Sequence, residues 1–173
     1  LDISLTQLKD HVERLRSRDW PIIHHPLGFV RLPLTESDRL KAGYYLHVWP
    51  ESRIESQPTE YSIHCHIFDL TSRVLIGQIV DILYEMTPNT EGEYQLMTAN
   101  HNAVGPSVLE PQGARYSCLS ESRRAINAGE RYTIPSGAFH STELPTVLTC
   151  TLMEKGNVDA NSKPKHLAKE LLE

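Results

Sequence analysis

Two short stretches of the sequence constrain the fold more than any other feature. The first is Ile63-His64-Cys65-His66, and the second runs from Gly129 to His140. Each lies among apolar and β-branched residues, so each is predicted as a strand that enters or leaves a turn. Successive side chains of a strand point to opposite faces, so His64 and His66 share one face while Cys65 takes the other. Two such imidazoles can lean toward one metal ion, at about 2.0 to 2.2 Å from each nitrogen.

The second stretch supplies a third histidine. Gly129, Pro135, Gly137 and His140 follow the pattern Gly-X5-Pro-X-Gly-X2-His. Pro135 presets φ and Gly137 accepts a positive φ, so together they predict a tight turn, after which His140 begins the next strand. A strand far away in the sequence thus adds one imidazole to the two of the first stretch. We therefore predict a metal site formed by His64, His66 and His140.

The two stretches resemble the paired motifs of the cupin family. The second motif of that family is matched at all four of the positions just named. The first motif contains His-X-His and a closing glycine, which are matched by His64, His66 and Gly77, whereas Pro58 replaces the opening glycine. The resemblance covers about residues 28 to 155. It implies an all-β fold, the double-stranded β-helix or jelly-roll barrel, with the metal in the mouth of the barrel.

The first motif departs from the family pattern at a residue that matters for chemistry. Cupins usually carry a glutamate ligand seven residues before the closing glycine, and Leu70 stands at that position. Strand parity places Asp69 on the face opposite the two histidines unless a bulge intervenes, so Asp69 is a reserve ligand. Glu143 is three residues after His140, so strand parity also places it on the face opposite the histidine. We therefore expect three neutral histidines, and whether Asp69 or Glu143 is an additional ligand stays open.

Three neutral histidines leave a divalent ion with its full charge and with open coordination positions. Such an ion attracts an anionic or chelating substrate and can admit O₂. Imidazole suits Fe, Zn, Cu and Ni alike. Within the cupins, three-histidine sites resemble those of the thiol dioxygenases, which use Fe(II) and O₂. Leu70 stands where cysteine dioxygenases carry a crosslinked cysteine, and their Ser-X-His-X-Tyr relay is missing from residues 147–153, so the cysteine-specific reaction is not expected.

The resemblance therefore favours a non-haem Fe(II) oxygenase of the dioxygenase type that acts on a small polar or anionic metabolite. A zinc, nickel or manganese cupin acting as a lyase, isomerase or hydrolase is the first alternative. A non-catalytic module that binds small molecules is the second. Tyr84 and Tyr132 are the candidates for moving protons, and Arg73 and Arg115 are the candidates for holding a substrate carboxylate.

Composition disfavours several other classes of protein. The 173 residues carry a net charge of −5 and no basic block, so a nucleic-acid groove is not expected. The three cysteines show no Cys-X-X-Cys spacing, which argues against a disulfide framework and a thiolate zinc site and favours a reducing, cytoplasmic location. The most apolar run, residues 74–84, is too short to span a bilayer. A homodimer is expected because cupins are often dimers.

One barrel domain with two flanking segments is expected. The N-terminal segment, residues 1–19, is predicted to hold an amphipathic helix over 2–17 that packs on the outside of the barrel or forms a dimer contact. Its apolar residues recur at helical spacing: Leu1, Leu5, Leu8, Val12 and Leu15. The barrel itself is expected over 20–156. A linker and a short helix over His166–Leu172 are expected in the C-terminal segment, 157–173.

Short strands separated by Pro, Gly, Asn and Asp fill the barrel region. The predicted strands are 29–32, 44–48, 62–67, 72–84, 94–98, 107–109, 114–119, 131–134 and 147–153. Residues 86–113 lie between the two motifs and are expected to form a variable loop or hairpin. The remaining histidines are interpreted as ordinary core or surface residues: His11, His24, His25, His47, His101 and His166.

Overall fold

The computed structural model describes residues 6, 9, 10, 13, 23–25, 27–34, 43–50, 62–100, 108–143 and 147–169. Nearly all of them lie in strands. In chain order these strands are β1 (Ile23–His25), β2 (Phe29–Pro33), β3 (Gly43–Trp49), β4 (Ile63–Cys65), β5 (Phe68–Ile76), β6 (Gln78–Pro88), β7 (Tyr94–Asn100), β8 (Val108–Asn127), β9 (Arg131–Ile134), β10 (Phe139–Glu143), β11 (Thr149–Val158) and β12 (Lys165–Lys169).

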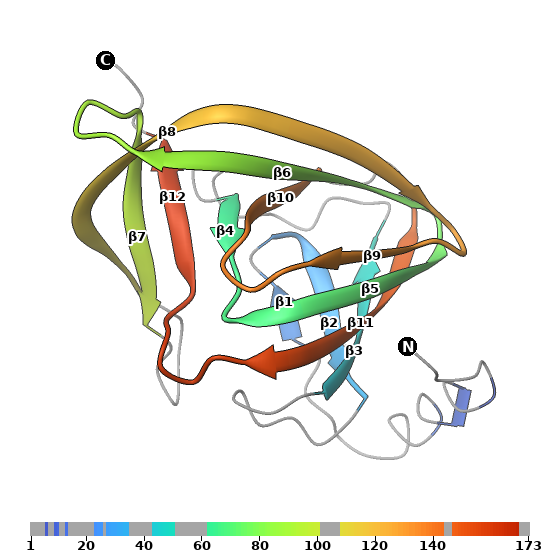
Figure 1. Ribbon diagram of the computed structural model, residues 1–173. Coiled ribbons are helices and arrows are strands. Elements are labelled where there is room, and N and C mark those ends of the chain that lie inside the picture. The colour runs from blue at the N-terminus through green and yellow to red at the C-terminus, as the bar shows by residue number, and fades with distance from the viewer. Residues whose placement is uncertain are drawn as a thin grey trace.

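The strands form two antiparallel sheets (Figure 1). The first sheet has the order β1-β2-β3-β11-β5-β9. The second has the order β10-β4-β12-β7-β8-β6 and closes on itself, because β10 pairs with β6 as well as with β4. In Figure 1, β6 and the long β8 arch over β5 and β9. The predicted all-β architecture of two sheets is therefore confirmed.

The main core lies between the two sheets. One cluster of buried side chains joins Phe29, Trp49 and Val74 of the first sheet to Ile79 and Ile126 of the second. Another joins Tyr45, Leu70, Ile134 and Met153 of the first sheet to Leu83 of the second. Full burial of a large apolar side chain contributes about 1.5 to 3 kcal/mol. These contacts hold the inner faces of the sheets together, and the inner faces also carry the histidines.

The helix predicted over His166–Leu172 is wrong for the residues that the structure describes. Lys165–Lys169 form β12, which pairs with β4 and with β7. The segment alternates between exposed lysines at its ends and a fully buried Leu167 at its centre. Leu167 packs against Ile63 and Leu96. Five residues carry too weak a local preference to decide between helix and strand, so the tertiary pairing decides.

Most of the helix predicted over residues 2–17 lies outside the described residues. Residues 6, 9, 10 and 13 have helical backbone, and Lys9 and Glu13 form an exposed i,i+4 ion pair. These four residues do not establish the helix or its packing, which stay predictions. Within the described part of the chain, no helix has the length and apolar character needed to cross a membrane.

The strand predicted over residues 72–84 is two strands joined at Gly77. Gly77 has a φ of +76° and separates β5 from β6. A Cβ atom there would lie 2.3 Å from Thr149 Oγ1 and 2.7 Å from the carbonyl oxygen of Leu148. Conversely, the predicted strands 107–109 and 114–119 belong to the single strand β8, which passes through Gly113 at a φ of +72°. Residue 107 lies outside the described residues.

Replacing Gly77 with alanine is expected to destabilise the fold by about 2 to 5 kcal/mol, because backbone strain adds to overpacking against Thr149. Gly113→Ala is the matched control. Gly113 also has a positive φ, but a Cβ atom there meets nothing within 4 Å. Its expected cost is only about 1 to 2 kcal/mol. Urea unfolding measures both variants, and equal losses would contradict the role of the close contact.

Candidate metal centre

The turn from Pro135 to Gly137 joins the two histidine motifs. Gly137 has a φ of +79°, which confirms the predicted turn conformation. Its N–H donates to the carbonyl oxygen of His66 at 2.9 Å. Because β10 begins directly after this turn, the bond brings His140 to the first motif. Strands β10 and β4 then pair, with His140 directly opposite His64.

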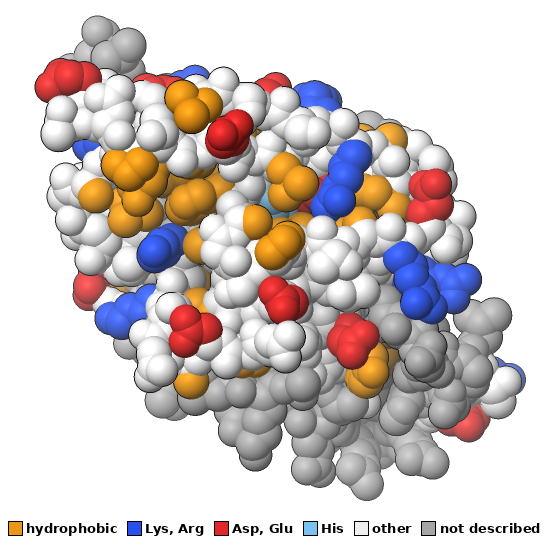
Figure 2. Space-filling view, in the orientation of Figure 1, with side chains coloured by type: hydrophobic (Ala, Val, Ile, Leu, Met, Phe, Trp, Pro, Cys, Tyr) orange, Lys and Arg blue, Asp and Glu red, His pale blue; other side chains and the backbone are white. Residues whose placement is uncertain are grey.

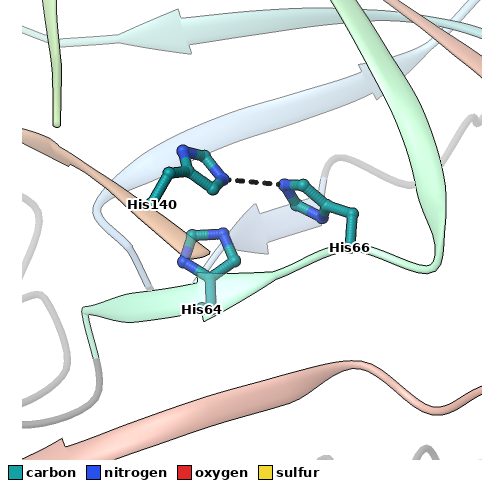
Figure 3. Close-up of side chains that lie close together, drawn as sticks. All are labelled: His64, His66 and His140. Carbon is teal, nitrogen blue, oxygen red and sulfur yellow. Dashed lines mark hydrogen bonds between the residues drawn. The ribbon is translucent and has the colours of Figure 1, made fainter. Parts of the chain in front are cut away.

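His64 of β4, His140 of β10 and His66, which directly follows β4, lie together (Figure 3). One ring nitrogen from each lies within 4.8 Å of the others. The Nε2 atoms of His66 and His140 are 3.1 Å apart, as the dashed line in Figure 3 marks. His64 and His140 are buried, whereas His66 is partly exposed. Figure 2 shows a small area of histidine surface among hydrophobic and charged side chains.

Two facing antiparallel sheets and a histidine cluster built from both motifs are what the resemblance implied. The observed architecture and the cluster therefore agree with the resemblance to cupins.

Hydrogen bonds determine which nitrogens of the two buried rings face the cluster. His64 Nδ1 donates to the carbonyl oxygen of Ser62 at 2.9 Å, and His140 Nδ1 donates to Oδ1 of Asp81 at 2.9 Å. Because both partners are acceptors, the proton of the neutral ring lies on Nδ1 and the Nε2 atom keeps its lone pair. A metal-binding imidazole uses one bare nitrogen while its other N–H is held in this way.

Burial keeps two of the rings neutral. It lowers the pKa of His64 and the pKa of His66 well below the usual value, and the positive charge that His140 can carry lowers both further. A ring with a lowered pKa is unprotonated at neutral pH. The nitrogens of these two histidines are therefore available to a metal without first losing a proton.

A buried carboxylate, Asp81, holds the Nδ1 side of the His140 ring. Asp81 of β6 is fully buried, and its second oxygen accepts two hydrogen bonds from Arg124 of β8, at 3.1 Å from Nε and 2.9 Å from an Nη atom. Arg124 also donates to the carbonyl oxygen of Thr133 and lies over the ring of Tyr132. Arg124 thus balances the charge of Asp81 while Asp81 orients the His140 ring.

The carboxylate expected of most cupins is absent from the cluster in the described part of the chain. Leu70 is buried in the core between the sheets. Asp69 lies outside the cluster and accepts hydrogen bonds from the Ser136 N–H at 2.9 Å and from Asn157 at 3.1 Å. The Ser136 bond first and then the Asn157 bond hold the pKa of Asp69 below its usual value. Glu143 forms an ion pair with an arginine of β8 and also lies outside the cluster.

The two candidate tyrosines lie on different faces of their sheets. Tyr132 packs in the core between the sheets, and burial raises its pKa to about 12. Tyr84 follows Leu83, which lies opposite His140, so alternation places Tyr84 on the other face of the second sheet. The Tyr84 hydroxyl is 3.0 Å from Oγ of Ser141. The structure thus brings Tyr132 to the inner face but does not bring Tyr84 there.

The two candidate arginines lie on different sheets, Arg73 on β5 of the first and Arg115 on β8 of the second. Arg73 is exposed and alternates with the buried Ser72 and Val74 on β5. Arg115 of β8 donates its Nε to the carbonyl oxygen of Gly92 at 2.7 Å, so it supports the turn that precedes β7. Arg73 therefore points away from the core, and the role of Arg115 as a substrate ligand stays a prediction.

Sequence reasoning missed three histidines that lie near the cluster. His166 on β12 lies opposite His64, and the two rings stack with centroids 5.5 Å apart. His25 of β1 and His47 of β3 belong to the inner face of the first sheet, where both contact the Phe29 ring. Burial and then the charge of nearby Arg31 lower the pKa of His25 to about 3. His101 and His11 lie outside the described residues.

Comparisons with known proteins add distant likenesses only. No family model and no curated protein matches the sequence. Among solved structures, the DMSP lyase DddQ from Ruegeria pomeroyi DSS-3 is 14% identical, with 95% of this chain and 69% of that chain covered and a TM-score of 0.47. KdgF from Halomonas sp. is 14% identical, with coverages of 82% and 92% and a TM-score of 0.41. Hydroquinone 1,2-dioxygenase from Sphingomonas sp. TTNP3 is 12% identical, with coverages of 74% and 66% and a TM-score of 0.41.

Proposed function

We propose that this chain is a metal-dependent enzyme, a non-haem Fe(II) oxygenase that acts on a small polar or anionic metabolite. The observation that carries the proposal is the convergence of three imidazoles, two of which have their Nδ1 protons held by neighbouring oxygens. No carboxylate belongs to this cluster among the described residues. An ion held by three neutral ligands keeps its full charge, which favours a substrate that chelates it through a negative group.

The residues around the cluster prepare it for this chemistry. When bound, Fe(II) would supply the electrons that activate O₂. Asp81 keeps the His140 ring in one orientation, and the Phe68 ring stacks on His66 and covers it with an apolar surface. Tyr132, which packs between the sheets, is the proposed group that moves protons.

Metal analysis of protein purified without oxygen tests this proposal. We expect about one equivalent of iron per chain, and oxygen uptake that requires both Fe(II) and one member of a panel of hydroxy acids, amino acids and thiols. Turnover of a substrate without oxygen, by protein that holds zinc, nickel or manganese, would replace the oxygenase with the lyase, isomerase or hydrolase alternative. Protein that binds no divalent ion after reconstitution would leave the non-catalytic binding module.

A further inference from the structure

A row of polar side chains lies on the inner face of the first sheet, across the core from the histidine cluster. Arg31 of β2 lies opposite His47 of β3 in the strand register, and Trp49 follows two residues later on the same face. The Phe29 ring lies 4.4 Å from the His47 ring and 4.5 Å from the Trp49 ring, between centroids. Because Phe29 and Trp49 pack against Ile79 of the second sheet, this face is turned toward that sheet.

Two nitrogens of the row lack a hydrogen-bond partner in the described part of the chain. They are Nε1 of Trp49, a residue only 5% exposed, and Nε2 of His47, and both atoms are buried. An indole N–H can only donate. Folded proteins seldom keep a buried donor without an acceptor, because its lost hydration is not replaced. Two such atoms on one face indicate a place where a ligand supplies the acceptor.

This row and the histidine cluster share one interior. Tyr132 packs against the buried cluster that holds Phe29 and Trp49, and also against the cluster on which Leu83 packs. Leu83 lies directly opposite His140 in the strand register. Packed side chains therefore connect the row to the histidine cluster.

We propose that a small carboxylic acid binds between the sheets, with its carboxylate on Trp49 Nε1 and His47 Nε2 and its other end at the histidine cluster. A carboxylate fits because it accepts several hydrogen bonds and donates none. The Arg31 guanidinium, 5.2 Å from the centre of the Tyr45 ring, adds a positive charge beside His47. This inference rests on the proposed function and specifies the class of its substrate.

Calorimetric titration with linear dicarboxylates from malonate to adipate tests the inference, with the uncharged diamides as matched ligands. It is carried out on the metal-free and on the metal-loaded protein. We expect binding of at least one dicarboxylate but of no diamide, and tighter binding by the metal-loaded form. Trp49→Phe keeps an aromatic ring but removes the N–H, so it is expected to weaken dicarboxylate binding about 10-fold or more. Tyr44→Phe, which removes a hydroxyl group from the opposite face of the same strand, is the control and should bind normally.

The outcomes separate this inference from the proposed function. Unchanged dicarboxylate binding by Trp49→Phe, with normal metal content, would overturn the carboxylate site and leave the metal site standing. Failure of the protein to take up metal would overturn the proposed function, and the metal-free titration would still judge the carboxylate site. If Trp49→Phe does not fold, His47→Phe removes the second nitrogen of the row and is expected to weaken the same binding. Unchanged binding by that variant would overturn the inference.

Discussion

Replacing His140 with alanine is expected to lower the affinity for Fe(II) by more than about 100-fold. His140 is central to the cluster, since its ring centroid lies 4.5 Å from that of His64 and 5.1 Å from that of His66. Loss of a residue that only supports a metal ligand already costs about 10 to 100-fold in affinity, so loss of the ligand itself costs more. Metal content after dialysis, and competition with a chelator of known affinity, measure the effect.

Two further variants control this experiment. Glu143→Gln changes the same strand outside the cluster, so its metal affinity is expected to equal that of the wild type. A large loss there would instead identify Glu143 as an additional ligand. His64→Ala removes a ligand whose Nδ1 partner is a backbone carbonyl, so it leaves no buried carboxylate without its partner. If the His64 and His140 variants both retain wild-type metal content, the cluster is not a metal site.

The part of the site that depends on local rules could be predicted from the sequence. The His-X-His spacing predicts His64 and His66 together, and they do cluster, although His66 follows the end of β4. The Pro135-to-Gly137 turn accounts for the start of the strand that carries His140. The absence of a carboxylate at Leu70 could also be read directly. These features require only strand periodicity and turn chemistry, which a single sequence contains.

The residues that hold the metal ligands in place could not be predicted, because their contacts depend on pairing between distant strands. Asp81 lies directly opposite Arg124 in the register of β6 with β8, 43 residues apart. In the sequence, the only sign of Asp81 was a charge inside an apolar run. Arg73 was proposed for the interior, but parity cannot be carried from β4 to β5 through the turn at His66 and Ile67. The homodimer and the cytoplasmic location stay predictions.

Asparagine in place of Asp81 is expected to weaken metal binding by about 10 to 100-fold, although Asp81 is not itself a ligand. The amide can still accept from His140, but it cannot provide the negative charge that faces both His140 and Arg124. The fold is also expected to lose about 1 to 3 kcal/mol. The loss stays below that of a fully buried ion pair, since the Arg124 side chain is 34% exposed and water can reach it.

Asp69→Asn is the matched control for Asp81→Asn, because it also replaces a hydrogen-bonded carboxylate with an amide. Asp69 also accepts hydrogen bonds from its neighbours, but it lies outside the cluster, so this variant should keep wild-type metal affinity. The absorption spectrum of Co(II)-loaded protein adds a readout that stability alone does not change, because a rotated His140 ring alters the ligand field. If Asp81→Asn loses stability but keeps both its metal affinity and this spectrum, then Asp81 stabilises the pairing of β6 with β8 without orienting the ligand.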